Sequence, residues 1–227
     1  MSKQEKLKKL NQQTLACQKC DLRQTCSQVV PGAGSAEAEI MFIGEGPGKE
    51  EDKQGIPFVG AAGKFLDEML EMISLKREDV YIANVVKCRP PNNRDPLPEE
   101  AEACWPWLER QIKIINPKLI VTLGRHSLER FLPGQKISQI HGKALRRAVP
   151  KMGIRIFYAL YHPAAALYNG SMREVLIKDF KKIPKVLEAV KKEKINSSQS
   201  AAGAQDAASP FEKISNLPEE NRQESLF

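Results

Sequence analysis

The sequence predicts an α/β fold in which helices cover both faces of a mostly parallel, four-stranded sheet. Segments with strand composition alternate with segments of helical periodicity, and each strand segment is almost wholly apolar, as in sheets that are buried on both faces. The loops rich in Gly, Pro, Asn and His follow the strands rather than precede them. These loops should therefore gather at the sheet edge where such folds bind ligands.

Each expected element rests on a local pattern. Short apolar runs rich in β-branched and aromatic residues predict strands over residues 39–43, 80–86, 118–123 and 154–160. Helices are expected over residues 3–16, 60–73, 98–115, 124–131 and 171–192. The helical period is clearest at Phe65, Leu66, Met69, Leu70 and Ile73, and Pro98 suits the first turn of its helix.

Length and composition narrow the class of protein. The chain has 227 residues and 41% hydrophobic residues, enough for one sizeable core. No apolar run approaches the roughly 18 residues of a membrane span, and the N-terminus lacks the apolar segment of a secretory signal. We therefore expect a cytoplasmic monomer without membrane contact, in which structural disulfides are disfavoured.

Charge is unevenly distributed along the chain. The net charge is +7, but residues 195–227 carry −3 and the preceding residues +10. A basic globular part favours a polyanionic partner such as nucleic acid, the alternative being a basic protein without one. After about Asn196 the sequence becomes polar and small, which predicts a globular domain over residues 1–194 and a flexible segment over residues 195–227.

Five cysteines in such a chain suggest a metal site. Cys17 and Cys20 form a C-x2-C pair, and Cys88 and Cys104 form a second, more widely spaced pair. Four thiolates suit zinc or an iron–sulfur cluster, and the wide second pair favours a cluster over a zinc ribbon. Small buried hydrophobes are the alternative interpretation, and Cys26 is the expected bystander.

The loop after the second strand combines two kinds of chemistry. Asn84 offers an amide donor and acceptor at the end of the strand, and Cys88 offers a soft ligand just beyond it. Pro90 and Pro91 then force an extended path. If Asn84 binds a ligand and Cys88 holds a metal, the metal fixes this loop beside the ligand pocket.

Six motifs occur together in this chain. They are Cys17-x2-Cys20, Gly44-Glu45-Gly46-Pro47-Gly48, Gly55-Ile56-Pro57-Phe58-Val59-Gly60, Asn84-Val85-Val86-Lys87-Cys88-Arg89-Pro90-Pro91, Cys104 and His162-Pro163-Ala164-Ala165. Each alone is weak, but in this combination and order, over residues 15–190, the chain resembles the family 4 uracil-DNA glycosylases. The resemblance implies a three-layer α/β/α fold, hydrolysis of the bond between uracil and deoxyribose in DNA, and a structural [4Fe–4S] cluster on Cys17, Cys20, Cys88 and Cys104.

The resemblance also assigns roles around the base. Phe58 would stack on a flipped uracil, Asn84 would pair with its O4 and N3–H, and His162 would donate to O2, where charge develops as the bond breaks. The glycosylases with an aspartate in the first motif use it to position water; here Gly46 aligns with it, so Glu45 is the candidate to orient water. The expected uracil-binding set is Gly44, Glu45, Gly46, Gly48, Phe58, Asn84 and His162, with His162 and Glu45 catalytic.

Contacts with DNA and with a partner are expected outside the pocket. Leu167 is the expected wedge that fills the space left by the base. Basic side chains that could follow the phosphates are Lys87, Arg89, Arg94, Arg146, Arg147 and Arg173, with Arg89 and Arg173 the main candidates. The C-terminal Gln223-Glu224-Ser225-Leu226-Phe227 resembles the peptide with which bacterial proteins dock on the DNA sliding clamp, Gln223, Leu226 and Phe227 making the contacts. We therefore expect a nucleoid-associated bacterial enzyme acting on single- or double-stranded DNA.

Two other classes of function remain as alternatives. One is a non-catalytic iron–sulfur or zinc module that binds nucleic acid in a replication or repair assembly. The other is an electron carrier, which is disfavoured because carriers group their cysteines tightly and need no polar pocket. The set of Phe58, Asn84 and His162 favours the enzyme, because a pure binding module has no use for it.

Overall fold

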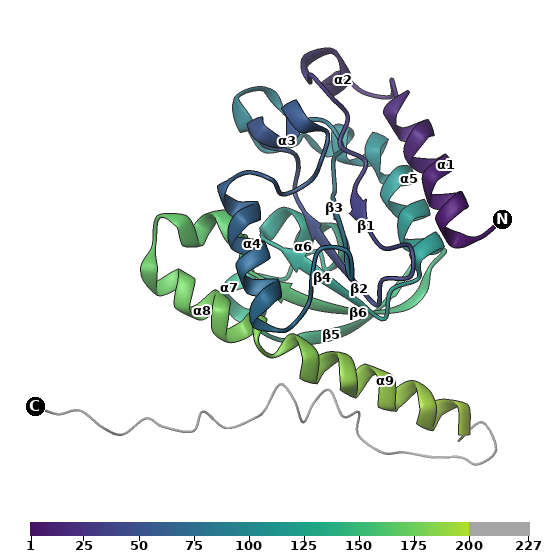
Figure 1. The fold of residues 1–227 in the computed structure, drawn as a ribbon, viewed down its shortest axis with the longest axis vertical. Coiled ribbons are helices and arrows are strands. Elements are labelled where there is room, and N and C mark those ends of the chain that lie inside the picture. Colours follow the sequence, from purple (N-terminus) through teal and green to yellow (C-terminus); the bar gives the residue numbers. More distant parts are fainter. Residues whose placement is uncertain (200–227) are drawn as a thin grey trace, which may run out of the picture.

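A single six-stranded sheet organises residues 1–199, the part of the chain that the computed structural model describes (Figure 1). The strand order is β1-β3-β2-β4-β6-β5. The inner strands β3, β2, β4 and β6 are parallel, and β1 and β5 join the two edges antiparallel. The strands are β1 (Ala33–Gly34), β2 (Ile40–Gly44), β3 (Tyr81–Asn84), β4 (Leu119–Leu123), β5 (Ala144–Val149) and β6 (Gly153–Leu160).

The predicted α/β class is confirmed, but the predicted number of strands is wrong. The four expected strands are the inner, parallel ones, whose residues in β2, β3 and β4 are all buried. Both missed strands lie at edges. β1 has only two residues, and β5 is partly or fully exposed along its length, so neither shows the continuous apolar run that identifies an inner strand.

Four of the five predicted helices are confirmed within a residue or two, and the fifth is divided. The α-helices are α1 (Lys3–Leu15), α2 (Leu22–Thr25), α3 (Lys49–Gln54), α4 (Ala61–Met72), α5 (Pro98–Ile115), α6 (Arg125–Phe131), α7 (Ile137–Ile140), α8 (Gly170–Phe180) and α9 (Ile183–Gln199), with 3-10 turns η1 (Pro91–Asn93) and η2 (Pro163–Leu167). The expected helix over residues 171–192 is α8 plus α9. Pro184 explains the break, because proline fits a first helical turn but not a helix interior.

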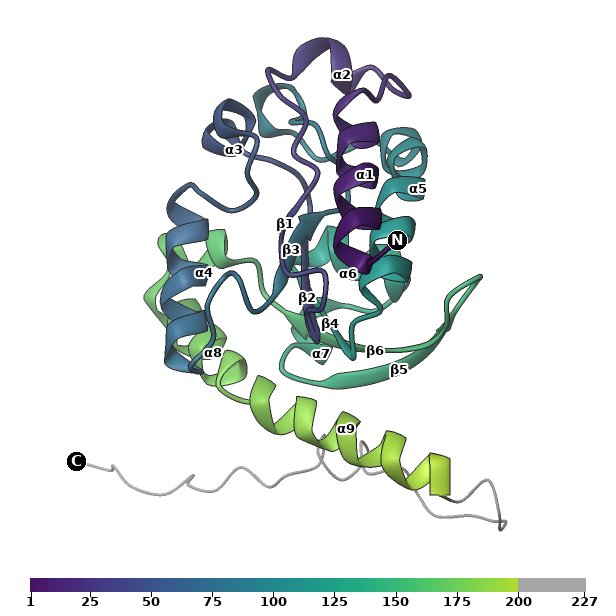
Figure 2. The same cartoon turned by 45° about the vertical axis from the view of Figure 1, so that its right-hand side comes forward.

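Two buried clusters show that helices cover both faces of the sheet. Met41 of β2 points into a cluster with side chains of α1, α5 and α6, whereas the next residue, Phe42, points into a cluster with α4, α8 and α9. The alternation follows from the two-residue period of a strand. Figures 1 and 2 show the resulting three layers, with α1 and α5 beside each other on one side and α4 and α8 on the other.

The parallel strands end level with one another. Gly44 at the end of β2 pairs with Asn84 at the end of β3, and Leu123 of β4 pairs with Leu160 of β6. The loops that follow these four residues therefore leave the sheet at a single edge. This register brings the glycine-rich loop, the proline-rich loop and His162 close together from distant parts of the sequence.

Most of the predicted C-terminal segment, residues 200–227, lies outside the described residues. This part includes the peptide Gln223 to Phe227, so the clamp-binding role stays a prediction. Helix α9 continues to Gln199, beyond residue 195, where the flexible segment was expected to begin. Within residues 1–199, no helix has both the length and the apolar character needed to cross a membrane.

Candidate active site

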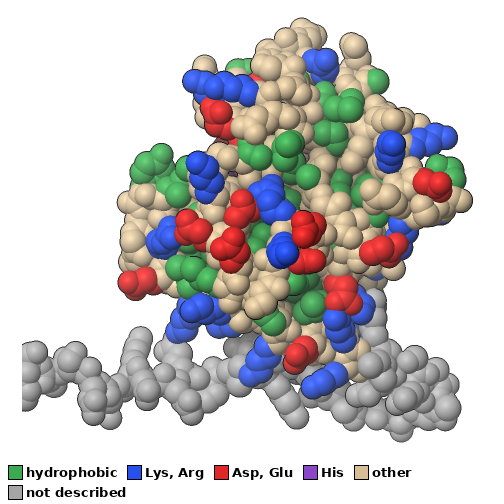
Figure 3. Space-filling model, viewed as in Figure 1, with side chains coloured by type: hydrophobic (Ala, Val, Ile, Leu, Met, Phe, Trp, Pro, Cys, Tyr) green, Lys and Arg blue, Asp and Glu red, His purple; other side chains and the backbone are tan. Residues whose placement is uncertain are grey.

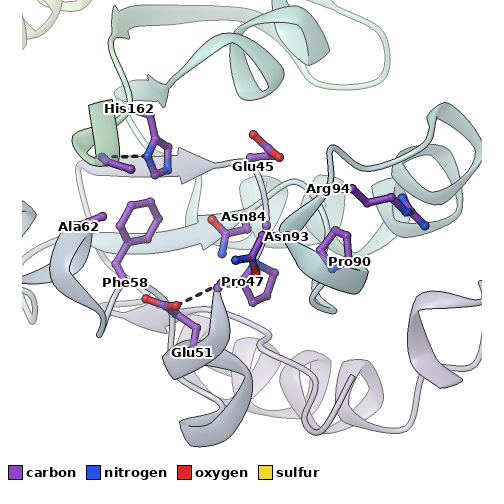
Figure 4. A pocket seen from close by; sticks show the side chains of 13 residues that line it. Glu45, Pro47, Glu51, Phe58, Ala62, Asn84, Pro90, Asn93, Arg94 and His162 are labelled. Atoms are coloured by element: carbon purple, nitrogen blue, oxygen red, sulfur yellow. Dashed lines mark hydrogen bonds between the residues drawn. The ribbon is translucent and has the colours of Figure 1, made fainter. Parts of the chain in front are cut away.

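A pocket of about 320 Å³ opens at the carboxyl edge of the parallel strands (Figure 4). Its walls come from the loop after β2, the turn before α4, the end of β3, the proline-rich loop and the turn after β6. The lining residues are Glu45, Gly46, Pro47, Gly48, Glu51, Phe58, Ala62, Asn84, Pro90, Asn93, Arg94, His162 and Ala164. Six of the seven residues expected to bind a base are among them, and the seventh, Gly44, lies against Asn84 and Phe58.

Asn84 presents an unused hydrogen-bonding atom to this pocket. The residue is only 1% exposed, and its Oδ1 has no hydrogen-bond partner in the part of the chain that the structure describes. Leaving a buried polar atom unpaired is unfavourable, so a pocket ligand that supplies the missing partner of Asn84 would be favoured. A Cβ atom at Gly44 would lie 2.5 Å from this Oδ1 and 2.7 Å from Cζ of Phe58, so glycine keeps the space between them open.

Phe58 lies beside Asn84 in the pocket wall (Figure 4). Its ring centroid lies 5.6 Å from that of His162, and the two ring planes differ by 29°. Its backbone has φ of +54°, in the left-handed region that non-glycine residues rarely adopt. A flat face of this kind suits a planar, aromatic ligand.

His162 is held as a neutral hydrogen-bond donor. The backbone N–H of Ala164 donates to Nδ1 of His162 at 3.1 Å, so the neutral ring carries its proton on Nε2. Burial lowers the pKa of His162 to about 4, and the carboxylate of Glu51 offsets only part of this effect. At neutral pH the ring is therefore uncharged and can donate through Nε2.

Glu45 belongs to a small group of titratable side chains. Nε2 of His126 lies 3.7 Å from Oε2 of Glu45 and 3.1 Å from Oδ1 of Asp95, and Arg125 hydrogen-bonds both His126 and Asp95. Burial raises the pKa of the Glu45 carboxyl, with His126 acting in the opposite direction. One ligand-type atom from each of Glu45, Asp95 and His126 thus lies within 4.8 Å of the other two.

Four of the five cysteines surround one cavity, which they share with Lys87, Val29 and neighbouring side chains. They come from three segments: Cys17 and Cys20 follow α1, Cys88 follows β3, and Cys104 lies in α5. The indole N–H of Trp107 donates to Sγ of Cys17 at 3.1 Å, and the backbone N–H of Lys87 donates to Sγ of Cys104 at 3.3 Å. These bonds suit thiolate acceptors.

The donor set fits a four-thiolate metal group. Burial raises the pKa of the Cys104 thiol to about 11 and also raises that of Cys88, so a bound cation is what would favour their thiolate forms. Cys26 is buried and does not line the cavity. The pKa of Cys88 is raised mainly by burial and, to a smaller extent, by the neighbouring Cys26 side chain. The structure therefore groups around one cavity the four cysteines that the resemblance assigns to the cluster, with Cys26 beside Cys88 but outside the cavity lining.

Lys87 was expected on the phosphate path, and this prediction is wrong. Its side chain is 1% exposed, and its Nζ donates to the backbone carbonyl of Asn84 at 2.9 Å and to Oε1 of Gln111 at 2.8 Å. Lys87 thus lies between the cysteine cavity and the last residue of β3. Arg146 and Arg147 are also misplaced, because they lie on β5 opposite Ile156 and Arg155, well before β6 reaches the pocket edge. Figure 2 shows this hairpin extending away from the other strands.

The remaining DNA-contact candidates are partly or fully exposed. Leu167 is 36% exposed at the end of η2, and the adjacent Tyr168 is 93% exposed. Arg173 bonds Glu68 at 2.6 Å and lies over the ring of Phe65, and Arg89 donates to Asn93 at 2.7 Å. On the face shown in Figure 3, basic and acidic side chains are interspersed, so this face has no continuous basic track.

Sequence reasoning missed several pocket residues. Asn93 and Arg94 reach the pocket because η1 turns the proline-rich loop back, and Asn93 adopts a left-handed conformation there. Glu51 lies at the third position of α3 and accepts the backbone N–H of Gly48 at 3.1 Å. A glutamate three residues after a helix-capping position is a recognisable signal, so Glu51 could have been found. His126 and Asp95, which lie beside Glu45 without lining the pocket, carry no such signal.

The fold and the pocket define an α/β protein with a base-sized, aromatic-walled site at the carboxyl edge of its sheet. A family model described as the uracil DNA glycosylase superfamily matches residues 31–191. The chain therefore belongs to the uracil DNA glycosylase superfamily.

Curated relatives narrow this assignment. The chain is 51% identical over 183 residues to a type-4 uracil-DNA glycosylase of Sulfurisphaera tokodaii, covering 78% of this chain and 83% of the relative. It is 50% identical over 185 residues to a type-4 uracil-DNA glycosylase of Archaeoglobus fulgidus, covering 79% and 92%. A type-4 uracil-DNA glycosylase of Thermotoga maritima is 43% identical over 183 residues, covering 80% and 94%. Within the superfamily, the chain is thus similar to type-4 enzymes over most of its length, as the sequence motifs predicted.

Proposed function

We propose that this protein is a type-4 uracil-DNA glycosylase, which flips uracil out of DNA and hydrolyses its N-glycosidic bond to leave an abasic site for base excision repair. The observation that carries the proposal is the unpaired, buried Oδ1 of Asn84 beside Phe58 and a neutral His162. The similarity to type-4 enzymes over most of the chain supports it. The alternative of a non-catalytic binding module is not favoured, since it leaves the pocket without a use.

Asn84 would give the pocket its preference for uracil. Its Oδ1 would accept the uracil N3–H, and its amide group would donate to O4. Cytosine lacks the N3–H and carries an amino group in place of O4, so it would leave the buried amide unpaired on both sides. Sites that depend on buried polar groups reject such analogues strongly for this reason. Extruding the base costs a few kcal/mol, and stacking on Phe58 would offset part of that cost.

His162 would stabilise the leaving base. As the glycosidic bond breaks, negative charge builds on the uracil, including O2, while the sugar becomes cation-like. A fixed Nε2–H donor aimed at O2 interacts more strongly with that charge than with the neutral base, so it lowers the barrier selectively. Because Ala164 already occupies Nδ1, the ring needs no rearrangement to donate in this way.

Glu45 would hold the attacking water at the side of the pocket. The neighbouring position is Gly46, so no aspartate takes this role. The raised pKa of the Glu45 carboxyl supports a carboxylate that can accept a proton from water as it adds to the sugar. We expect Glu45 to contribute less to the rate enhancement than His162, because departure of the stabilised base leaves a sugar cation that water attacks readily.

We also propose that Cys17, Cys20, Cys88 and Cys104 hold a [4Fe–4S] cluster. The single cavity and the N–H donors aimed at Cys17 and Cys104 support a cluster of thiolate ligands. When bound, such a group would act as a structural cross-link, because glycosidic hydrolysis transfers no electrons. These residues would tie the segment after α1 and the loop after β3 to α5, and so fix the loop that carries Pro90, Asn93 and Arg94 beside the base.

Contacts with the rest of the DNA complete the proposal. Leu167 would enter the space left by the flipped base, and Arg89 and Arg173 would contact phosphates, so binding should weaken as salt rises. Beyond the described residues, Gln223, Leu226 and Phe227 would dock on a DNA sliding clamp and keep the enzyme at replicating DNA in the cytoplasm. Deleting residues 223–227 should abolish binding to purified clamp; unchanged binding would rule this role out.

The central test uses the purified full chain and a labelled oligonucleotide with a single uracil. Alkali cleaves the strand at any abasic site, so cleavage reports excision, and the same oligonucleotide with cytosine or thymine is the control. We expect cleavage at uracil alone, in single- and double-stranded DNA, and its loss in Asn84→Ala. Tight binding without cleavage would support the non-catalytic module instead.

A further inference from the structure

The turn that carries Phe58 has an unfavourable backbone. Phe58 is buried, yet its φ is +54°, whereas most other non-glycine residues with positive φ in the described chain are asparagine or lie at exposed turns. Such a conformation persists only where the surroundings impose it, and it occurs preferentially at functional sites. The contacts around residues 57–60 identify what imposes it.

Arg77 holds the two carbonyl groups of this turn. From the loop after α4, its guanidinium donates to the backbone carbonyl of Pro57 at 2.5 Å and to that of Phe58 at 2.7 Å. The same group donates to Asp67 of α4 at 2.8 Å, which fixes its position. An arginine presents its donors in a rigid fork, so the two carbonyls are set relative to each other as well as to the helix.

Glu51 holds the two following amides. Its Oε1 accepts the backbone N–H groups of Val59 and Gly60, each at 2.9 Å, and its Oε2 accepts that of Gly48 at 3.1 Å. One carboxylate therefore joins the glycine-rich loop to the Phe58 turn. Arg77 and Glu51 together satisfy both sides of the turn, the carbonyls from one side and the amides from the other.

The space behind the turn is equally restricted. A Cβ atom at Gly63 would lie 1.9 Å from the carbonyl oxygen of Phe58, so only glycine lets α4 approach this closely. The turn is thus fixed from three directions. The side chain of Phe58 is restricted as well, because its ring packs beside His162.

We propose that Arg77 is a positioning residue for base recognition. It keeps Phe58 in the left-handed conformation that presents the ring to the base, and it does so without lining the pocket. The inference rests on the proposed function for the role of the ring, but the contacts that hold the turn do not depend on it. Glu51 holds the same turn from the other side, but it also lines the pocket, so its substitution would change the pocket directly. Arg77 does not line the pocket and is therefore the residue to test.

The first experiment compares Arg77→Met and Arg77→Lys with wild type. Because a displacement of the stacking ring by about 1 Å can cost on the order of 10²-fold, we expect Arg77→Met to lower single-turnover excision by about 10- to 100-fold. It should weaken inhibition by free uracil by a similar factor, since the base alone contacts Phe58. Arg77→Lys, which keeps one donor, should be intermediate. Arg147→Met, an exposed arginine on the β5–β6 hairpin, is the matched control and should behave as wild type.

A double-mutant cycle separates positioning from general destabilisation. If Arg77 acts through the ring, adding Arg77→Met to Phe58→Ala should change excision by less than about twofold, because the interaction is already lost. A full 10- to 100-fold loss in the Phe58→Ala background would overturn the inference. A melting temperature for each variant shows whether it is folded.

Amide hydrogen exchange gives a readout that is independent of activity. In Arg77→Met the amides of Val59 and Gly60 should exchange at least about tenfold faster than in wild type or Arg147→Met, as the turn opens locally. Unchanged exchange would overturn the inference even if excision fell. If exchange is faster in Arg77→Met but the wild-type protein does not excise uracil, Arg77 still holds the turn and only the proposed function is rejected. The two failures are therefore distinguishable.

Discussion

The backbone N–H of Ala164 donates a 3.1 Å hydrogen bond to Nδ1 of His162, and this single contact fixes which ring nitrogen faces the pocket. Proline at position 163 starts the 3-10 turn that brings the amide back over the ring. The motif His162-Pro163-Ala164 therefore orients a neutral imidazole ring. It makes Nε2 the donor at neutral pH without help from a charged partner.

The first prediction compares His162 with Glu45. Loss of a donor aimed at developing charge costs about 10²–10³-fold in rate, so His162→Ala should lower single-turnover excision by that factor. Glu45→Gln should lower it by less than about tenfold, or about 1.4 kcal/mol. His141→Ala is a matched control, since His141 bonds Asp179 outside the pocket. Comparable losses in His162→Ala and Glu45→Gln would show that water activation, not the leaving base, limits the reaction.

The second prediction concerns stability and pH. The pKa of His162 is lowered from 6.5 to about 4 by burial, so between these values the unfolded chain takes up a proton that the folded chain does not. Stability should therefore fall as pH drops through that window, by up to about 3 kcal/mol from this residue. His162→Asn keeps an acceptor for Ala164 but does not titrate.

Urea unfolding of both proteins at pH 7 and at pH 4.5 measures this contribution. The free energy of unfolding of wild type should fall more than that of His162→Asn over the same interval. Parallel changes in the two proteins would mean that His162 is as easily protonated in the folded state as in the unfolded chain.

The third prediction concerns the cysteines. Cys17→Ser should lose iron, inorganic sulfide and visible absorbance, because Cys17 lines the shared cavity. Its melting temperature should fall by at least about 5 °C, which corresponds to a loss of roughly 1–3 kcal/mol in a protein of this size. Cys26→Ala should keep the metal, since Cys26 does not line that cavity. If the wild-type protein instead contains one tightly bound zinc ion and no iron, the four cysteines form a zinc site and the cluster proposal is wrong.

The inner sheet and the pocket were within reach of sequence reasoning because each carries a local signal. Continuous apolar runs identify β2, β3 and β4. Polar residues at or directly after their ends, such as Asn84 and Glu45, mark the edge where ligands bind. The edge strands β1 and β5 lack that signal, since β1 has only two residues and β5 is partly or fully exposed along its length.

The supporting contacts were not within reach, because they join residues whose spacing carries no pattern. Arg77 meets the carbonyl of Phe58 across 19 positions, and nothing in its neighbourhood marks it as different from an exposed arginine. Lys87 was misassigned for a related reason. A lysine in a loop of a basic chain suggests a contact with DNA. Lys87 is instead buried, with its Nζ bonded to Gln111 of α5, and nothing near Lys87 in the sequence indicates this contact.

The last prediction tests where the base lies. A Cβ atom at Gly44 would meet Oδ1 of Asn84 at 2.5 Å and the Phe58 ring at 2.7 Å, so Gly44→Ala should displace the two side chains proposed to hold uracil. Because a displacement of recognition groups by about 1 Å can cost on the order of 10²-fold in rate, we expect excision to fall by about 10- to 100-fold. Binding to undamaged DNA, which depends on surface contacts, should keep its salt dependence. Gly170→Ala, where a Cβ meets nothing within 4 Å, is the matched control. Full activity in Gly44→Ala would place the base elsewhere in the pocket, away from Asn84.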